Sequence, residues 1–390
     1  MNPSANGWIK KLLKELSTKD TLFNLNEETF YDALRSSGFI YGSNFEVVCN
    51  HISNKDLTED ELCKINLCLA LLYTHKNSSS EVPFVESVIT FYTEINELKT
   101  SYFSGFLGDK KTSEQLEKII HKRILLDDNF ITKNFNYFII NAFLYIDILA
   151  YQEFLTKESI AINYIKKLEA SIETISLNVL NSKESKNKYD ESLIKLFEAS
   201  LRYQSNSPLT FPQALTNINS TLEKYYILDL ACMASWSDKT IDKNEHNFLI
   251  QLGNKLHIEK NYVNNSIHSV TDFFIAHKNH IAFLSSTNMV QSFYNNSSKM
   301  VKKLITRNSK RLYQELKDSK ELMMLLTQST KRDLNNEEQK KVQEQLLDVF
   351  KSIPSLAIFL LPGGAILLPL VVKFIPKLLP SAFDENRVED

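Results

Sequence analysis

Hydrophobic positions recur at helical spacing over most of the chain. The first such stretch, residues 8–16, places on one face Trp8, Ile9, Leu12, Leu13 and Leu16. This is the i, i+3, i+4 pattern of an amphipathic helix. Such a helix can lie on a membrane surface, but we favour packing against its own domain.

Residues that break helices are rare. The chain has 8 glycines and 9 prolines in 390 residues, and residues 213–353 hold a single glycine and no proline. Strand-and-turn architectures could hardly be built with so few turn residues. We therefore predict an all-α fold, with several helices before a proline-interrupted apolar segment near the C-terminus.

Local signals mark two helix starts, and one acidic residue lies on a predicted core helix. Thr58 and Glu61 have the spacing of a capping box, and so do Thr112 and Gln115. Residues 130–155 are apolar and aromatic but too often interrupted by polar residues for a membrane span, so we predict a core helix there. Asp147 on this helix either lies at a solvent-wetted edge, which we favour, or pairs with Arg123.

Proline positions and composition suggest the domain organisation. Pro208 and Pro212 mark the clearest boundary in the chain. We predict an N-terminal helical domain (1–207), a second helical domain (213–290), a basic helical lead-in (291–352), a membrane segment (353–383) and an acidic tail (384–390).

The segment 353–383 differs in composition from the rest of the chain. Residues 353–372 carry no charge, and twenty helical residues are about as long as the ~30 Å hydrocarbon core of a bilayer. The regularly spaced Pro354, Pro362, Pro369 and Pro376 and the pair Gly363-Gly364 interrupt the segment. Such breaks are tolerated in lipid only where other groups satisfy the freed backbone. A kinked span is favoured over a re-entrant hairpin or a hairpin buried in a soluble domain.

The same segment resembles the membrane segment and exit of the Letm family of mitochondrial inner-membrane proteins and their bacterial relatives. The residues that carry the resemblance are Pro362, Pro369, Lys373, Phe374, Pro376, Leu379, Pro380, Ser381 and Phe383. The resemblance implies a membrane protein connected with cation and proton exchange, whose relatives continue into a helical ribosome-binding region.

This chain departs from the family pattern in two ways. Family members carry an acidic residue at the position of Ala365, and an intramembrane carboxylate is typical of ion movement, so its absence argues against a self-sufficient exchanger. The chain also ends seven residues after Phe383. We therefore expect the ribosome-binding region to be missing.

A basic stretch precedes the apolar segment. Residues 299–332 hold ten basic and three acidic residues, and we predict one helix here because apolar residues keep helical spacing at Val301, Leu304, Ile305, Leu312 and Leu316. A solvated face is the favoured interpretation. The alternative is contact with anionic lipid headgroups or ribosomal RNA through Lys299, Lys302, Lys303, Arg307, Lys310 and Arg311. By the positive-inside rule, this stretch would keep the N-terminal part in the cytoplasm.

Residues 222–258 read as helix, acidic turn, helix, and resemble the tellurite-resistance TerB-like helical domain. Asp238, Asp242 and Glu245 are weak candidates for holding a hard cation. The favoured interpretation is that Asp242 caps the next helix with Glu245 at its N3 position, which needs no metal. The turn lacks the ladder of acidic and amide residues of an EF-hand.

Little else points to chemistry. With 45 basic and 47 acidic residues, the chain has no overall field to attract nucleic acid, and we expect no DNA partner. Four scattered cysteines suggest buried thiols in a reducing compartment. No phosphate loop, His-Glu-x-x-His or nucleophile elbow occurs, so we predict neither an enzyme nor a cofactor.

Two functions remain open. The first is a membrane-anchored, Letm-like protein in cation and proton homeostasis or envelope organisation. The alternative is a ribosome-binding or scaffolding adaptor for which the apolar segment is only an anchor. The expected partners are the lipid bilayer, the ribosome and a second copy of the chain.

Overall fold

The structure is a computed structural model, and its regular elements are helices. It describes residues 2–17, 22–50, 57–97, 112–124, 142–157, 162–182, 209–236, 241–277, 301–332, 334–353, 356, 371–372 and 374–376. No strand occurs among these residues, which confirms the all-α prediction. The chain divides into two units, one of residues 7–126 with 135–285, and one of residues 286–390 with 2–6 and 127–134.

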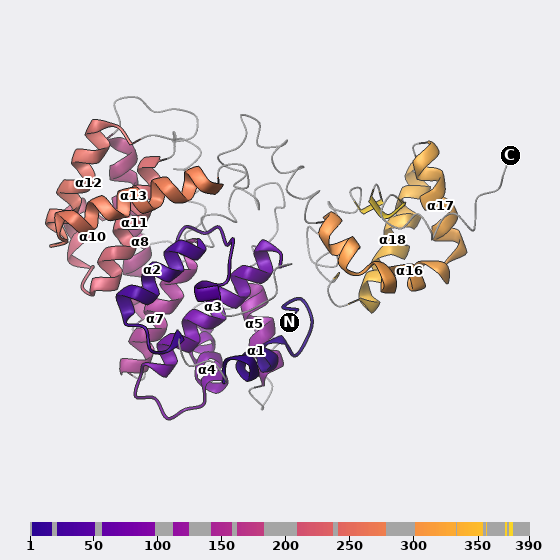
Figure 1. Cartoon of the computed structure of the whole chain (residues 1–390), viewed down its shortest axis with the longest axis horizontal. Coiled ribbons are helices and arrows are strands. Elements are labelled where there is room, and N and C mark those ends of the chain that lie inside the picture. Colours follow the sequence, from indigo (N-terminus) through magenta and orange to yellow (C-terminus); the bar gives the residue numbers. More distant parts are fainter. Residues whose placement is uncertain are drawn as a thin grey trace. The chain divides into compact units, whose positions relative to one another are not determined.

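The helices of the first unit follow one another along the chain as labelled in Figure 1. They are α1 (Trp8–Leu16), α2 (Glu27–Ser37), the 3-10 turn η2 (Val48–Asn50), α3 (Glu59–Lys76), α4 (Phe84–Glu97), α5 (Ser113–Ile124), α7 (Leu144–Lys157), α8 (Ile162–Asn181), α10 (Phe211–Thr216), α11 (Thr221–Ser235), α12 (Lys243–Lys255) and α13 (Lys260–His277).

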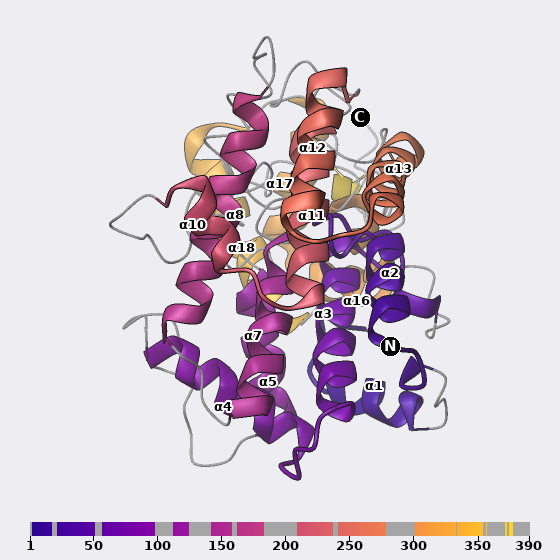
Figure 2. The same cartoon turned by 90° about the vertical axis from the view of Figure 1, so that its left-hand side faces the viewer.

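The first half of this unit is built around α3. The predicted capping box starts this helix: Thr58 Oγ1 accepts from the Glu61 backbone N–H at 3.3 Å, and Glu61 Oε2 accepts from the Thr58 N–H at 2.9 Å. Every residue from Glu61 to Tyr73 is buried. A helix buried on all sides needs partners all round, and α4, α5 and α7 provide them (Figure 2).

The second half is built around α11, which is likewise buried from Tyr226 to Trp236. Helices α8, α12 and α13 pack on α11, and α10 packs on α8. Helix α8 precedes Pro208 and packs on α10, which contains Pro212, and on α11. Residues on both sides of the predicted boundary therefore belong to one unit. The two halves share a single hydrophobic core.

Helix α1 packs on its own unit, as the amphipathic pattern predicted. It buries Trp8, Ile9, Leu12 and Leu16 against a surface that includes α5. Gly7 at its N-cap has no side chain to satisfy the first backbone N–H groups. Glu117 of α5 does so instead, accepting from the N–H groups of Gly7 and Ile9 at 2.9 Å each.

Asp147 is buried and paired, so the favoured prediction of a wetted edge is wrong and Arg123 is its partner. Its carboxylate is 0% exposed. It accepts from Arg123 Nε at 2.7 Å, from Arg123 Nη2 at 2.5 Å and from the Tyr92 hydroxyl at 3.0 Å. A carboxylate taken out of water requires such a bidentate cation and additional donors.

A second buried acid joins α2 to α11. Asp229 lies 3.2 Å from Arg35 Nε and accepts from the Tyr31 hydroxyl at 2.6 Å. Burial raises the pKa of Asp229 above its usual value, and the Arg35 guanidinium opposes that rise. The two residues are 194 positions apart in the sequence. The local pattern of neither helix predicts their contact.

The second unit is a small helical assembly. It contains helical residues 301–307, α16 (Ser309–Lys317), α17 (Lys320–Lys331) and α18 (Asn336–Ser352). Helices α16, α17 and α18 pack on each other around a core of their own, whose largest side chain is Phe350. The five apolar residues predicted to share one face, Val301, Leu304, Ile305, Leu312 and Leu316, are all in this core.

The basic stretch is not one continuous helix, so that prediction is wrong. A turn at Asn308 separates residues 301–307 from α16, and a second break at Asp318 and Ser319 precedes α17. The Asn308 side chain donates to the Leu304 carbonyl at 2.7 Å, and such back-bonding competes with the helix ladder. The breaks let α16, α17 and α18 fold onto one core.

The apolar segment 353–383 lies largely outside the described residues. Its described parts are Ile353, Leu356 and the helical residues 371–372 and 374–376. Ile353, Leu356, Val371 and Ile375 are all buried in the core of the second unit. Among the described helices, none has the length and apolar character needed to cross a bilayer.

Described residues near both ends of the uncharged stretch 353–372, Ile353 and Val371 among them, therefore lie in one small core.

Candidate functional site

The basic residues selected from the sequence lie on the outer side of the second unit. The apolar face of residues 301–316 is buried in the core, so the remaining positions face outward. Lys302, Lys310 and Arg311 are exposed, and Lys303 and Arg307 are half-buried. Lys299, the sixth candidate, lies outside the described residues.

The positive charge is concentrated on this part of the unit. Residues 301–317 contain six basic residues, Lys302, Lys303, Arg307, Lys310, Arg311 and Lys317, and one acid, Glu315. We call this stretch the basic face. The remainder of the unit mixes charges: Lys341 Nζ lies 3.2 Å from Glu321, and Lys351 lies 2.6 Å from Asp348.

Arg311 ties the basic face to the end of α18. Its guanidinium Nη2 donates to the Ser352 carbonyl at the C-terminus of that helix. A cation at this end complements the negative end of the helix dipole and satisfies a carbonyl without an intrahelical partner. Ser352 directly precedes Ile353, so the contact places the basic face beside the start of the apolar segment.

The other end of α18 is held by a capping box and an arginine. Asn335 Oδ1 accepts from the Glu338 N–H, and Glu338 Oε2 accepts from the Asn335 N–H, each at 2.9 Å. Arg332 binds the same carboxylate in bidentate fashion at 2.8 and 2.6 Å. The hydrogen bond from Arg332, helped by the Asn335 backbone, lowers the pKa of Glu338 to about 2.

Few residues of the predicted family motif lie in the described part of the chain. Phe374 is half-buried against the core of the second unit, and Pro376 lies in the short helix that carries Ile375. The other motif residues lie outside the described residues: Pro362, Pro369, Lys373, Leu379, Pro380, Ser381 and Phe383.

In the first unit, Asp242 and Glu245 form the predicted helix cap. Each accepts the other's backbone N–H at 2.8 Å, and Glu245 is buried. Asp238, the third candidate cation ligand, lies outside the described residues. In the part of the chain that is described, no three His, Cys, Asp or Glu side chains come together as a metal site would require.

These features define an all-helical protein whose C-terminal unit combines a basic face with the start of an apolar segment. Residues 334–390, which include α18 and that segment, match the family model described as LETM1-like, RBD. Over these residues the chain is similar to the Letm family, which confirms the resemblance that the proline motif predicted. No curated protein and no solved structure matches the chain, and the TerB-like resemblance stays a prediction.

The match also bears on the family's ribosome-binding region. The sequence led us to expect that this region is missing, yet the model that matches residues 334–390 is itself described as the RBD. At least part of that family model is therefore present, and α18 is the longest described element within it. The basic face lies just before the matched residues and is tied to α18 by Arg311.

Proposed function

We propose that the chain is a non-enzymatic adaptor that binds the ribosome through its C-terminal unit. The observation that carries this proposal is the basic face, with six basic residues against one acid in residues 301–317, held against the helix that belongs to the LETM1-like RBD match. The first unit would then serve as the helical scaffold that the adaptor presents to other partners.

The physical basis is phosphate neutralisation. Lysines that contact a polyanion release its condensed counterions, and each contact contributes a salt-dependent term to the affinity. Exposed Lys302 and Lys310 suit such contacts because neither forms an ion pair within the described residues. Arg311 is different, since part of its bonding capacity holds α18.

The test is co-sedimentation of the full chain with purified bacterial ribosomes through a sucrose cushion. The variant Lys302→Gln/Lys303→Gln/Lys310→Gln removes three positive charges from the basic face and spares Arg311. We expect this variant to lose most of its ribosome-bound fraction, while circular dichroism shows an unchanged helix content.

A matched control is available on α1. Lys10, Lys11 and Lys14 are also exposed lysines on an amphipathic helix, so Lys10→Gln/Lys11→Gln/Lys14→Gln changes the net charge equally. We expect this control to bind like the unmodified chain. Equal losses in both variants would mean that the attraction is non-specific, and binding by neither form would reject the adaptor proposal.

A second candidate function is membrane anchoring, for which the supporting observation is the uncharged stretch 353–372 beside the basic face. Basic residues near a bilayer attract anionic headgroups by about 1 kcal/mol each. In this version the first unit lies in the cytoplasm and the anchored protein acts in cation and proton homeostasis. Carbonate extraction of membranes tests it, and release of the full-length chain into the soluble fraction would reject it.

Ion transport would have to use backbone groups, because the segment 353–372 has no titratable side chain. Kinks at Pro362 and Pro369 would free carbonyls that could coordinate a cation. Changing both prolines to alanine should abolish any cation flux in reconstituted vesicles. If the vesicles move no potassium, sodium or calcium under a proton gradient, the transport role is rejected and the adaptor role is the candidate that remains.

A further inference from the structure

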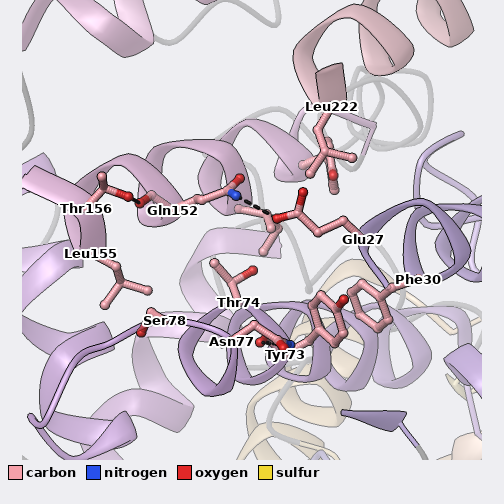
Figure 3. A pocket seen from close by; sticks show the side chains of 12 residues that line it. Glu27, Phe30, Tyr73, Thr74, Asn77, Ser78, Gln152, Leu155, Thr156 and Leu222 are labelled. Carbon is pink, nitrogen blue, oxygen red and sulfur yellow. Dashed lines mark hydrogen bonds between the residues drawn. The ribbon is translucent and has the colours of Figure 1, made fainter. Parts of the chain in front are cut away.

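A pocket of about 120 Å³ lies in the first unit, whereas the basic face and the family match belong to the second. Its lining comes from the start of α2, the end of α3, helix α7 and the start of α11. Figure 3 shows Thr74 in the middle of the lining, with the rings of Phe30 and Tyr73 on one side and Leu155 and Ser78 on the other.

The hydroxyl groups that line this pocket offer acceptors rather than donors. The hydroxyl hydrogens of Thr74, Ser78 and Thr156 are all donated to backbone carbonyls within their own helical turns, at 3.0, 2.7 and 2.9 Å. The Tyr73 hydroxyl likewise donates to the Leu25 carbonyl at 2.7 Å. What these groups present to a ligand is therefore oxygen lone pairs.

The two side-chain amides add acceptors and keep one N–H donor each. Asn77 Nδ2 donates to the Tyr73 carbonyl at 3.0 Å, and Gln152 Nε2 donates to Glu27 Oε1 at 2.9 Å. Each amide has used one of its N–H groups in this way, and its carbonyl oxygen makes no hydrogen bond within the described residues.

Glu27 adds a negative charge to the neutral acceptors of the lining. Glu27 lines the pocket and is exposed, and one of its oxygens accepts from Gln152 across the pocket, as Figure 3 shows. No basic side chain is among the lining residues. A carboxylate among neutral acceptors favours a ligand that is cationic and brings its own N–H donors.

The size and the apolar walls limit the ligand further. The stacked rings of Phe30 and Tyr73, 3.8 Å between centroids, and the side chains of Ile148, Leu155 and Leu222 form non-polar wall. An engineered apolar cavity of about 150 Å³ holds benzene, so about 120 Å³ suits a ligand of five or six non-hydrogen atoms.

From this geometry we propose that the pocket binds a small protonated alkylamine, with its ammonium group toward Glu27 and its carbon chain against the apolar wall. The ammonium brings up to three donors to a lining that supplies acceptors, and a cation near aromatic rings gains further attraction. This site is independent of the proposed ribosome contact.

The experiment is a ligand-observed NMR titration of the full chain with n-butylamine, 1-butanol and butyrate, which share a four-carbon chain and differ in charge. We expect n-butylamine to saturate with a Kd on the order of 1 mM, and the neutral and anionic probes to bind at least about tenfold more weakly. Equal binding of the alcohol, tighter binding of butyrate, or no saturable amine binding would overturn the proposal.

Variants locate the site. Because Glu27 is exposed, Glu27→Gln should leave the fold intact, and we expect it to weaken amine binding about fivefold. Glu28→Gln is the matched control, since Glu28 also lies in the first turn of α2 but accepts from Tyr225 and does not line the pocket. An equal loss in both variants would show that the amine responds to general charge, and the pocket proposal would fail.

Discussion

The buried ion pair of the first unit allows a quantitative test of how that unit is held together. Arg123→Met removes the guanidinium and keeps an unbranched apolar stem. It takes the bidentate cation away from Asp147, which is 0% exposed and also accepts from the Tyr92 hydroxyl at 3.0 Å. Breaking a buried pair by removing one partner costs about 3–5 kcal/mol. For a unit of this size, we expect the thermal midpoint to fall by on the order of 10 °C.

The assay is thermal and urea unfolding followed by circular dichroism, with two comparison variants. Replacing all three groups by apolar ones, in Tyr92→Phe/Arg123→Met/Asp147→Leu, should recover much of the lost stability because no buried charge remains unpaired. Lys157→Met is the exposed control: Lys157 pairs with Glu153 one turn away with 60% of its side chain accessible, so its loss should cost under about 0.5 kcal/mol.

The reasoning is refuted if Arg123→Met and Lys157→Met cost the same. Equal costs would mean that water reaches Asp147 and that the edge interpretation drawn from the sequence is right. A triple variant less stable than Arg123→Met alone would likewise contradict the claim that loss of the cation beside a buried carboxylate, rather than lost packing, dominates the destabilisation.

Three further predictions concern helix ends and the second core. Glu117→Ala should destabilise the first unit by about 1–3 kcal/mol, because two backbone N–H groups of α1 lose their acceptor, and hydrogen exchange at Gly7 and Ile9 should accelerate ahead of the rest of α1. The pKa of Glu338 is lowered to about 2, so the stability that its hydrogen bonds contribute is present above pH ~4.5 and lost as pH falls toward 2. In acid unfolding, Glu338→Gln should not show this loss of stability. Leu346→Ala, at a fully buried position, should cost the second unit about 2–5 kcal/mol, whereas exposed Lys340→Ala should cost little by the same urea unfolding assay.

Sequence reasoning succeeded where the physical cause is local. The capping boxes at Thr58 and Asp242 each depend on two residues three positions apart, and the buried face of α1 follows from spacing within nine residues. The motif at 362–383 led to the Letm family without any structural information, because its prolines are unusual in an otherwise proline-poor chain.

The contacts that sequence reasoning missed or misjudged join distant residues or depend on packing. Glu117 caps a helix 110 residues earlier, and Arg35 meets Asp229 only because α2 and α11 fold together. Helical spacing was correctly detected over residues 301–316, but it continues through Asn308 and so concealed the turn there. Arg311 was selected for its charge, and its contact with the Ser352 carbonyl depends on how α16 lies against α18.

The salt dependence of ribosome affinity tests the central claim most directly. For the full chain and the variant Lys302→Gln/Lys303→Gln/Lys310→Gln, the association constant is measured over a series of salt concentrations and its logarithm is plotted against that of salt. If these lysines contact phosphates, the slope becomes shallower by about 1 for each lysine removed, while the α1 control variant keeps the slope of the unmodified chain. An identical slope for all three proteins would contradict the basic face as the ribosome-binding surface.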